Sequence, residues 1–586
     1  MYDTIIRGGH IIDGTGRPAF TGDIAIENGR IAKVGGTINT AARQVIDADG
    51  AIVTPGFIDP HTHFDGQFLW DDVLEPAFSH GVTTAIGGNC GVGFAPLRHD
   101  CLEPLIELME GVEDIPGIVL TEGLDWQWST FPDYLDRLKE REYTIDVAAQ
   151  VPHAPLRVYV MGERALSHED ATAEDIAQMA RLMDDAMAAG AAGFSAGRIL
   201  EHVSSKGVRA PGYKAREEEL IALAQAMSRH NCGVFQIIPK GDSGDLINAP
   251  LSRDEREFEH GLMERIAMAG GRPVNYLLHQ IRNDPDDWVW MCEASARKRE
   301  EGIPIYPQVA PRGIGFLSSL DGHHPFLLKP SYREIAGLAI PERAAAMRDP
   351  ERRARILAET DIEATGPNAL RISGVVSRLT TGAGLMYALG DPPQYEPSSA
   401  DSFQSRAEAS GVTPLELYYD LLASGDGGNL AVFFMLNYWD RDLEAVRGMM
   451  DAPGSILGLG DGGAHLLAIC DGSFPTFCLS YWTRDRTRGD RFPLERMVHK
   501  LTGEIAALYG FSDRGRIAPG LRADINVIDH ARLQIERPRI VNDLPSGGRR
   551  YVQGSRGYLA TLVNGVVTRR FDSATGARPG RFARPN

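Results

Sequence analysis

The hydrophobic pattern divides the chain into two ends rich in short strands and a long middle of a different kind. Apolar and polar residues alternate on both sides of Asn28-Gly29, a pair typical of a tight hairpin turn. Asn564-Gly565 repeats the arrangement near the C-terminus. Neither end has enough strands for a stable sheet of its own, so we expect one small β domain built from both ends. Its two parts are residues 1–53 and 512–586.

The middle of the chain alternates between short apolar runs and stretches with helical periodicity. Residues 172–189 predict a helix that begins at Thr172, is supported by Asp175 three residues later, and ends at Gly190. A second helix, about 215–229, has an acidic first turn. Such strand–helix alternation is typical of parallel sheets. The eight candidate strands are about 52–58, 82–87, 145–152, 191–196, 233–238, 273–278, 303–309 and 455–460.

Eight strands of this kind indicate an α/β fold, a (β/α)8 barrel over residues 54–511. The seventh and eighth candidate strands are separated by about 145 residues, too many for a loop in a compact domain. We therefore expect an inserted subdomain, about 313–440, near the mouth of the barrel.

Composition and charge narrow the class of protein. The chain has 586 residues, 43% of them hydrophobic, and a net charge of -19. Such a surface repels phosphate backbones and anionic membranes, so we expect a small-molecule substrate and no nucleic-acid or membrane partner. Neither a membrane span nor a signal peptide is evident, which favours the cytoplasm, where the six cysteines would remain thiols. The sequence leaves the oligomeric state open, and a homo-oligomer is compatible with it.

Candidate metal ligands follow the predicted strands, at the end of a barrel where catalytic groups gather. The first strand ends in His61-Thr62-His63, and the two-residue period of a strand points both imidazoles the same way, an arrangement that suits a divalent metal. Each of these residues also has a purely structural interpretation. The histidine pair can arise by chance, Cys90 can be a small buried hydrophobe, His153 a hydrogen-bonded core residue and Asp461 a turn residue. Their shared position favours a metal site. The other strands end near Cys90, His153, Gln236, His279, Asp461 and His465.

Several longer motifs resemble a known family. "PGFIDPHTHFD", "DGGAH" and "RGRIAPGLRADINVID" resemble the amidohydrolase superfamily. "GNCGVGFAP" together with "MEGVEDIPG" is similar to the N-acyl-D-amino-acid deacylase (D-aminoacylase) branch. The resemblance implies a distorted TIM barrel, a small β-sandwich made from both termini, and metal-activated hydrolysis, usually with zinc.

The resemblance also implies roles for individual residues. It makes His61 and His63 ligands at the first metal position, Cys90 a thiolate ligand and His279 the histidine of strand six. Asp461 would be both a ligand and the general acid/base, taking a proton from the attacking water and passing it to the leaving nitrogen. An imidazole such as His153 could help to stabilise the oxyanion.

Three positions depart from the family pattern. Gln236 stands where the family has the strand-five histidine, and a neutral amide is a poor zinc ligand beside imidazole and thiolate. Ile281 replaces a lysine two residues after the strand-six histidine, and no arginine follows Asp461 until Arg484. The substrate therefore either lacks a free α-carboxylate or meets another cation. The candidates for substrate binding are Arg282, Arg312 and His465.

We interpret the chain as a metal-dependent hydrolase that cleaves the C–N amide bond of an N-acyl amine or N-acyl-(D-)amino acid. A hydrolase of a cyclic amide, lactone or related ring on the same site is the alternative enzyme. A barrel that lost its metal and became a non-catalytic scaffold is a third possibility. With the strand-five histidine missing, we predict one tightly bound zinc, or another divalent metal, held by His61, His63 and Asp461, with Cys90 and His279 as further ligands.

Overall fold

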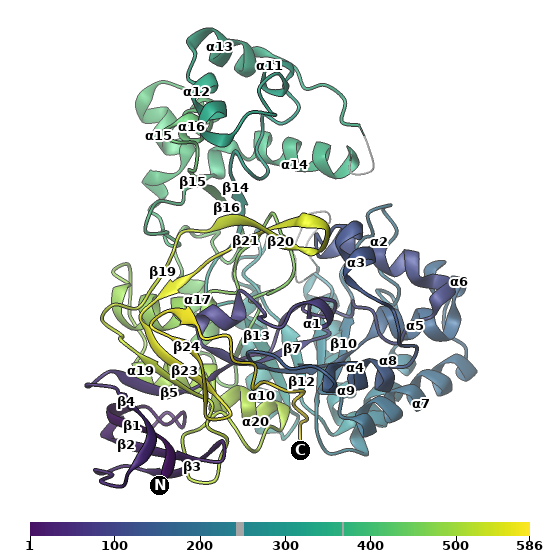
Figure 1. Cartoon of the computed structure of the whole chain (residues 1–586). Helices are drawn as coiled ribbons and strands as arrows, with labels where there is room; N and C mark the ends of the chain where they lie inside the picture. Colours follow the sequence, from purple (N-terminus) through teal and green to yellow (C-terminus); the bar gives the residue numbers. More distant parts are fainter. Residues whose placement is uncertain (242–250, 366–368) are drawn as a thin grey trace.

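The computed structural model describes residues 1–241, 251–365 and 369–586 (Figure 1). Its centre consists of parallel strands in two sheets, ordered β6-β7-β8 and β17-β13-β12-β11-β10-β9. These strands are β6 (Phe57–Asp59), β7 (Val82–Gly87), β8 (Asp146–Ala149), β9 (Val151–Pro152), β10 (Gly193–Gly197), β11 (Val234–Ile238), β12 (Val274–Leu277), β13 (Ile305–Val309) and β17 (Ile456–Leu457).

The two sheets join at both sides into one ring. Only Gln150 separates β8 from β9, so the third barrel strand passes from one sheet into the other. On the opposite side, Thr62 and Gly462 form a parallel bridge, and the His63 N–H donates to the Gly462 carbonyl at 2.8 Å. Eight parallel strands thus enclose the core, which confirms the predicted (β/α)8 barrel.

Helices connect the barrel strands, and capping residues that can be recognised in the sequence mark the ends of α7 (Ala173–Ala189). In α7, Thr172 and Asp175 form a reciprocal capping box and Gly190 terminates the helix with φ 114°, as predicted. The second predicted helix is α8. Among the described residues, no helix is both long enough and apolar enough to cross a bilayer. The helices are α1 (Gln67–Trp70), α2 (Leu102–Val112), α3 (Gly117–Gly123), α4 (Phe131–Lys139), α5 (His153–Met161), α6 (Glu163–Leu166), α7 (Ala173–Ala189), α8 (Glu217–Ser228), α9 (Arg253–Gly270), α10 (Asp287–Glu300), α17 (Glu444–Asp451), α18 (Phe474–Phe477), α19 (Leu494–Leu501) and α20 (Gly503–Tyr509).

Strands from both termini share one nine-stranded sheet. The two contributions meet where β5 pairs antiparallel with β18. Ile24, Val53, Ile525 and Leu562 belong to one buried apolar cluster, so strands from both termini share a common core. The strands are β1 (Tyr2–Ile11), β2 (Phe20–Glu27), β3 (Arg30–Val34), β4 (Ala42–Asp47), β5 (Ile52–Pro55), β18 (Ile525–Ile528), β23 (Tyr558–Val563), β24 (Val566–Arg570) and β25 (Ser573–Ala574).

The first predicted barrel strand, 52–58, is two strands in the structure. β5 belongs to the terminal sheet and β6 to the barrel, with Gly56 between them. A Cβ atom at Gly56 would lie 2.1 Å from Thr83 Oγ1, so only glycine fits where the chain passes between the sheets. Both pieces are fully buried, and their sequence therefore shows one continuous apolar run.

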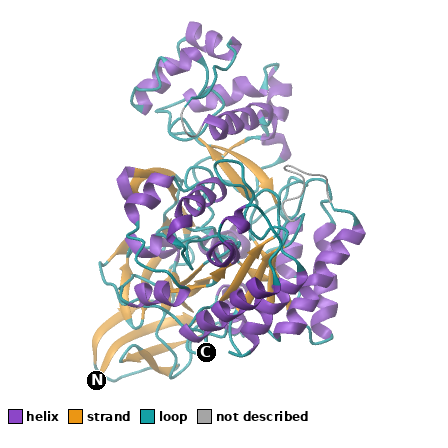
Figure 2. Cartoon of the chain, turned by 90° about the vertical axis from the view of Figure 1, so that its right-hand side faces the viewer, coloured by secondary structure: helices purple, strands orange, loops and turns teal. Residues whose placement is uncertain are grey.

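The long segment between β13 and β17 forms a separate layer, which we call the insertion (residues 314–436). Its helices stand at one end of the barrel in two perpendicular views (Figures 1 and 2). Residues 366–368 within it lie outside the described residues. Its strands pair antiparallel in the order β14-β16-β15. The elements are β14 (Ile314–Ser318), α11 (Pro330–Arg333), α12 (Ile340–Met347), α13 (Pro350–Ala358), α14 (Ala369–Thr381), β15 (Tyr387–Ala388), α15 (Phe403–Ser410), α16 (Pro414–Ala423) and β16 (Ala431–Leu436).

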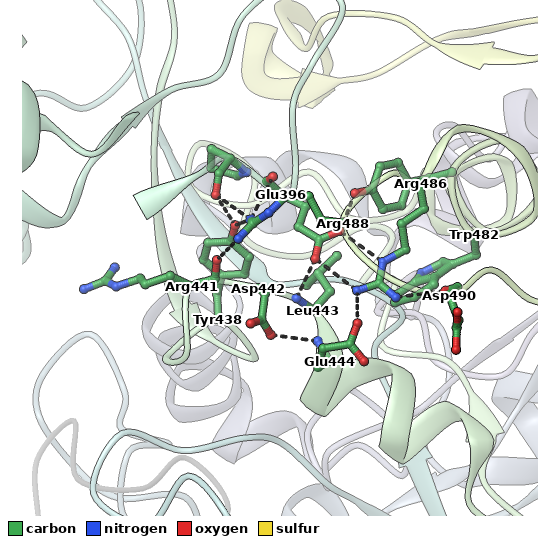
Figure 3. A network of polar contacts seen from close by, with 12 residues as sticks. Glu396, Tyr438, Arg441, Asp442, Leu443, Glu444, Trp482, Arg486, Arg488 and Asp490 are labelled. Carbon is green, nitrogen blue, oxygen red and sulfur yellow. Dashed lines mark hydrogen bonds and ion pairs between the residues drawn. The ribbon is translucent and has the colours of Figure 1, made fainter. Parts of the chain in front are cut away.

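A buried polar network ties the insertion to the barrel (Figure 3). Arg486 follows the π-helix η5 (Cys478–Asp485) and donates two hydrogen bonds of 3.1 Å to Glu396 of the insertion. Both side chains are 0% exposed. Arg488 donates a hydrogen bond of 3.2 Å to the hydroxyl of Tyr438, which follows β16.

The C-terminal part of the chain also reaches the insertion. The hairpin of β20 and β21 lies between the insertion and the barrel (Figure 1), where the hydroxyls of Tyr551 and Ser319 are 2.7 Å apart. The hairpin strands and their neighbours are β19 (Gln534–Ile535), β20 (Arg539–Leu544), β21 (Gly548–Val552) and β22 (Ser555–Arg556). The remaining short helical turns are η1 (Ala77–His80), η2 (His99–Cys101), η3 (Ala383–Leu385), η4 (Ser399–Asp401) and η6 (Pro545–Gly547).

Candidate metal centre

Two imidazoles lie side by side just after β6. His61 and His63 are 0% and 2% exposed, and their ring centroids are 5.5 Å apart. The backbone between them is fixed on both sides, because Thr62 donates to Ile86 of β7 and bridges to Gly462 beyond β17. The two-residue period of extended chain therefore places both rings on the same side, as predicted from the sequence.

Cys90 completes a compact donor set. It lies in the loop after β7 with a left-handed φ of 59°, and its Sγ is 3.2 Å from His61 Nε2. One donor atom each from His61, His63 and Cys90 lies within 4.8 Å of the others, and all three residues are buried. Imidazole nitrogens and a thiolate are ligands that zinc prefers. The residues of this chain therefore fit a divalent metal.

Asp461 faces the same centre from the other side of the barrel seam. It follows β17 with a left-handed φ of 45°. Its Oδ1 is 3.4 Å from His61 Nε2 and 3.8 Å from His63 Nε2. The carboxylate thus faces the Nε2 atoms of both imidazoles.

Burial governs the charge of these groups. Desolvation lowers the pKa of His61 to about 4 and that of His63 well below its usual value, so both imidazoles are neutral near pH 7. Burial raises the pKa of Asp461 to about 7, with a further increase from Asp471 and an opposing effect from His279. Neutral imidazoles have a lone pair to offer, and a cation beside Asp461 would favour its ionised form.

His279 follows β12 and is 7% exposed. Its electrostatic effects on the pKa values of both His61 and Asp461 place it close to the centre. Gln236, at the strand-five position, is 0% exposed, and its Oε1 accepts the Cys90 backbone N–H at 3.1 Å. The amide therefore supports the loop that carries the cysteine.

The remaining predicted residues have partners of their own. His153 is at the start of α5, where Nε2 is 2.7 Å from Glu219 Oε1 and the ring packs edge-on against Phe194. Arg312 is 1% exposed and is paired at 2.6 Å with Asp471. These contacts hold His153 and Arg312 within the protein interior.

The other two candidates for substrate binding lie in different surroundings. Arg282 is exposed, with its guanidinium 5.4 Å from the centre of the Trp439 ring. His465 Nε2 is 3.7 Å from Glu113 Oε2, and burial lowers the pKa of His465 to about 4. His465 also affects the pKa values of His61 and His63, which places it near the imidazoles of strand one.

Three residues near the centre escaped the sequence analysis. Glu113 is 1% exposed, and its Oε1 is 3.4 Å from His63 Nδ1. Gln308, on β13, accepts from His61 Nδ1 at 2.6 Å. His202 follows β10, and its pKa is lowered to about 3 by burial, with smaller effects from His465 and His61. The motif "MEGVEDIPG" contains Glu113, but this residue ends a helix rather than a strand, so the strand-end rule did not select it.

Comparison with known proteins identifies the family to which the chain belongs. The model of the "Amidohydrolase family" matches residues 44–569. D-aminoacylase of Alcaligenes xylosoxydans xylosoxydans is 27% identical over 593 residues, which cover 99% of this chain and 97% of that protein. A crystal structure of D-aminoacylase has a TM-score of 0.63 at 24% identity and covers 99% of both chains. N-acyl-D-glutamate deacylase from Bordetella bronchiseptica, in complex with zinc and a phosphonate inhibitor, has a TM-score of 0.63 at 23% identity and covers 100% of this chain and 99% of that one.

Proposed function

The chain belongs to the amidohydrolase family and is a hydrolase of carbon–nitrogen bonds other than peptide bonds, and we propose that its substrate is an N-acyl amino acid. The observation that carries the proposal is the buried set of His61, His63 and Cys90, with Asp461 facing it. Relatives named for the D-aminoacylase and N-acyl-D-glutamate deacylase activities match nearly the full chain and suggest the D-configuration. We further propose that the protein acts in the cytoplasm and that its partner is a small-molecule substrate.

The same residues would hold the metal. His61, His63 and Asp461 would bind one zinc, or another divalent ion, with Cys90 and His279 as further ligands. When bound, such an ion activates water for attack and polarises the acyl carbonyl. Three protein ligands with an open position are typical of catalytic zinc.

The proton transfer falls to Asp461. Its carboxylate accepts a proton from the water whose oxygen attacks the acyl carbon. It then gives that proton to the nitrogen as the C–N bond breaks, so the products are a carboxylate and an amine. Burial raises the pKa of Asp461 to about 7, so the carboxyl group can both accept and release a proton near neutral pH. The role of His153 as an oxyanion donor stays a prediction. Glu219 already occupies its Nε2.

We propose a single tight metal because Gln236 gives its oxygen to the Cys90 backbone. Of the family's ligand positions for a second ion, only His279 and a shared Cys90 then remain among the described residues, fewer than zinc sites commonly use. The test is elemental analysis after dialysis, run beside Gln236→His. One equivalent in the natural protein, rising toward two in the variant, is expected. Two tight equivalents in the natural protein would contradict the ligand assignment.

One observation favours the alternative of a ring substrate. Arg312 is committed to Asp471, and Arg282 is exposed beside Trp439, so neither offers an evident clamp for an α-carboxylate. A cyclic amide or lactone lacks that carboxylate. A panel of N-acyl-D- and N-acyl-L-amino acids, cyclic amides and lactones, followed by mass spectrometry, separates the two proposals. Hydrolysis confined to the cyclic compounds would replace the first proposal by the second.

A further inference from the structure

Each imidazole can bind a metal through one ring nitrogen, and the surroundings of its other nitrogen influence which one is free to do so. A neutral imidazole carries one N–H and one lone pair, and only the nitrogen with the lone pair can bind a metal. His61 and His63 each turn Nε2 towards Asp461. The groups at the two Nδ1 atoms therefore decide whether the lone pairs point into the centre or away from it.

Gln308 settles this choice for His61. Its Oε1 lies 2.6 Å from His61 Nδ1, and an amide oxygen only accepts, so Nδ1 must carry the hydrogen. The lone pair is then on Nε2, which faces Cys90 Sγ at 3.2 Å. Gln308 itself is rigidly held, because β13 pairs with β12 on one side and with β17 on the other, and its side chain is 0% exposed.

Glu113 occupies the equivalent place beside His63. Its Oε1 is 3.4 Å from His63 Nδ1, a buried atom with no hydrogen-bond partner among the described residues. The Glu113 backbone is fixed, because its N–H donates to Met109 at the end of α2 and its carbonyl accepts from the His465 N–H. Through His465, four residues after Asp461, Glu113 also touches the loop that carries the general acid/base.

We propose that Gln308 and Glu113 are positioning residues that each accept the Nδ1 hydrogen of one imidazole and thereby direct both Nε2 lone pairs into the metal centre. The inference rests on the proposed function, since it concerns the same site. Outer acceptors of this kind fix the ring orientation of metal-bound histidines and raise their basicity. The acceptor for His61 is the uncharged amide of Gln308, and the acceptor for His63 is the carboxyl group of Glu113.

The test measures zinc affinity by competition with a chromophoric chelator, using the full-length protein and Zn²⁺ alone. Glu113→Ala and Gln308→Leu each remove one acceptor and should weaken zinc binding by about 10- to 100-fold. Glu113→Gln keeps an acceptor oxygen and should recover most of that loss. Glu103→Gln is the control, because this side chain is on α2 but 82% exposed, and it should bind zinc like the natural protein.

The outcomes separate this inference from the proposed function. Natural affinity in both Glu113→Ala and Gln308→Leu would overturn the inference alone. Equal losses in Glu113→Ala and Glu113→Gln would also overturn it, because charge rather than an acceptor would then be decisive. A natural protein that binds no zinc would overturn the proposed function together with the inference. Melting temperatures of the metal-free variants identify a folding defect, and if Glu113→Ala fails to fold, Gln308→Leu decides.

Discussion

The buried pair of Arg486 and Glu396 gives a sharp prediction about how the insertion is attached to the barrel. Replacing Arg486 with methionine leaves the Glu396 carboxylate in a place where both side chains are 0% exposed. It removes two hydrogen bonds of 3.1 Å to Glu396 and an ion pair of 2.7 Å to Glu444. Breaking a buried pair by removing one partner costs about 3–5 kcal/mol. We expect that loss in the free energy that holds the insertion against the barrel.

The assay is the rate of limited proteolysis within the insertion, at protease concentrations where cleavage follows the population of the open form. Since about 1.4 kcal/mol corresponds to a factor of ten, the rate should rise at least about 100-fold in Arg486→Met. The matched control is Arg406→Met, because Arg406 is exposed on α15 of the same insertion. A change of this kind at the surface should stay within about 0.5 kcal/mol.

A double variant tests the reasoning directly. In Arg486→Met with Glu396→Gln, no charge is left buried without its partner, and the glutamine oxygen can still accept from the Leu443 N–H, as Glu396 does at 2.9 Å. The double variant should therefore lose less than the sum of the two single variants. Additive losses would refute the idea that the buried pair of Arg486 and Glu396 attaches the insertion to the barrel. A proteolysis rate in Arg486→Met that matches Arg406→Met would refute it as well.

Three further predictions concern the catalytic base, the pH dependence of stability and the shared sheet. Asp461→Asn should keep the fold but lower the turnover rate by about 100-fold or more, because an amide cannot accept the proton of the water; near-full activity on a verified substrate would remove Asp461 from this role. Burial lowers the pKa of His80 to about 3, so the unfolded chain binds more protons between about pH 6.5 and 3 and the free energy of unfolding should fall as the pH decreases through that window. Urea titrations should show a shallower dependence on pH in His80→Gln, and an unchanged slope would contradict this. Deleting residues 517–586 removes β18 and β23 from the core that they share with β2 and β5, so the product should be insoluble, and a soluble folded truncation would sink the claim of one shared domain.

The barrel and much of its centre could be predicted from the sequence because both depend on local patterns. Short apolar runs between helical stretches gave the strands, and Thr172 and Gly190 gave the limits of α7. The rule that chemistry gathers at strand ends selected His61 and Asp461, which the structure places 3.4 Å apart although 400 residues of chain separate them.

The parts that escaped prediction depend on contacts between distant segments. Gly56 divides one apolar run between two sheets, and the reason, the close approach of Thr83, lies outside that run. Glu113 ends a helix, and Gln308 is an uncharged residue within a strand, so neither has the sequence signature of a site residue. Their closeness to His63 and His61 arises from the closed barrel, which brings separate loops to one end.

The most direct test of the central claim is the release of free amine from a panel of N-acyl-D-amino acids before and after removal of the metal. The purified protein would be assayed as isolated, after exhaustive chelation, and after one equivalent of zinc is returned. We predict hydrolysis that disappears on chelation and returns with zinc, and that stays absent in a variant lacking both His61 and His63. Hydrolysis that survives complete removal of the metal would contradict the account.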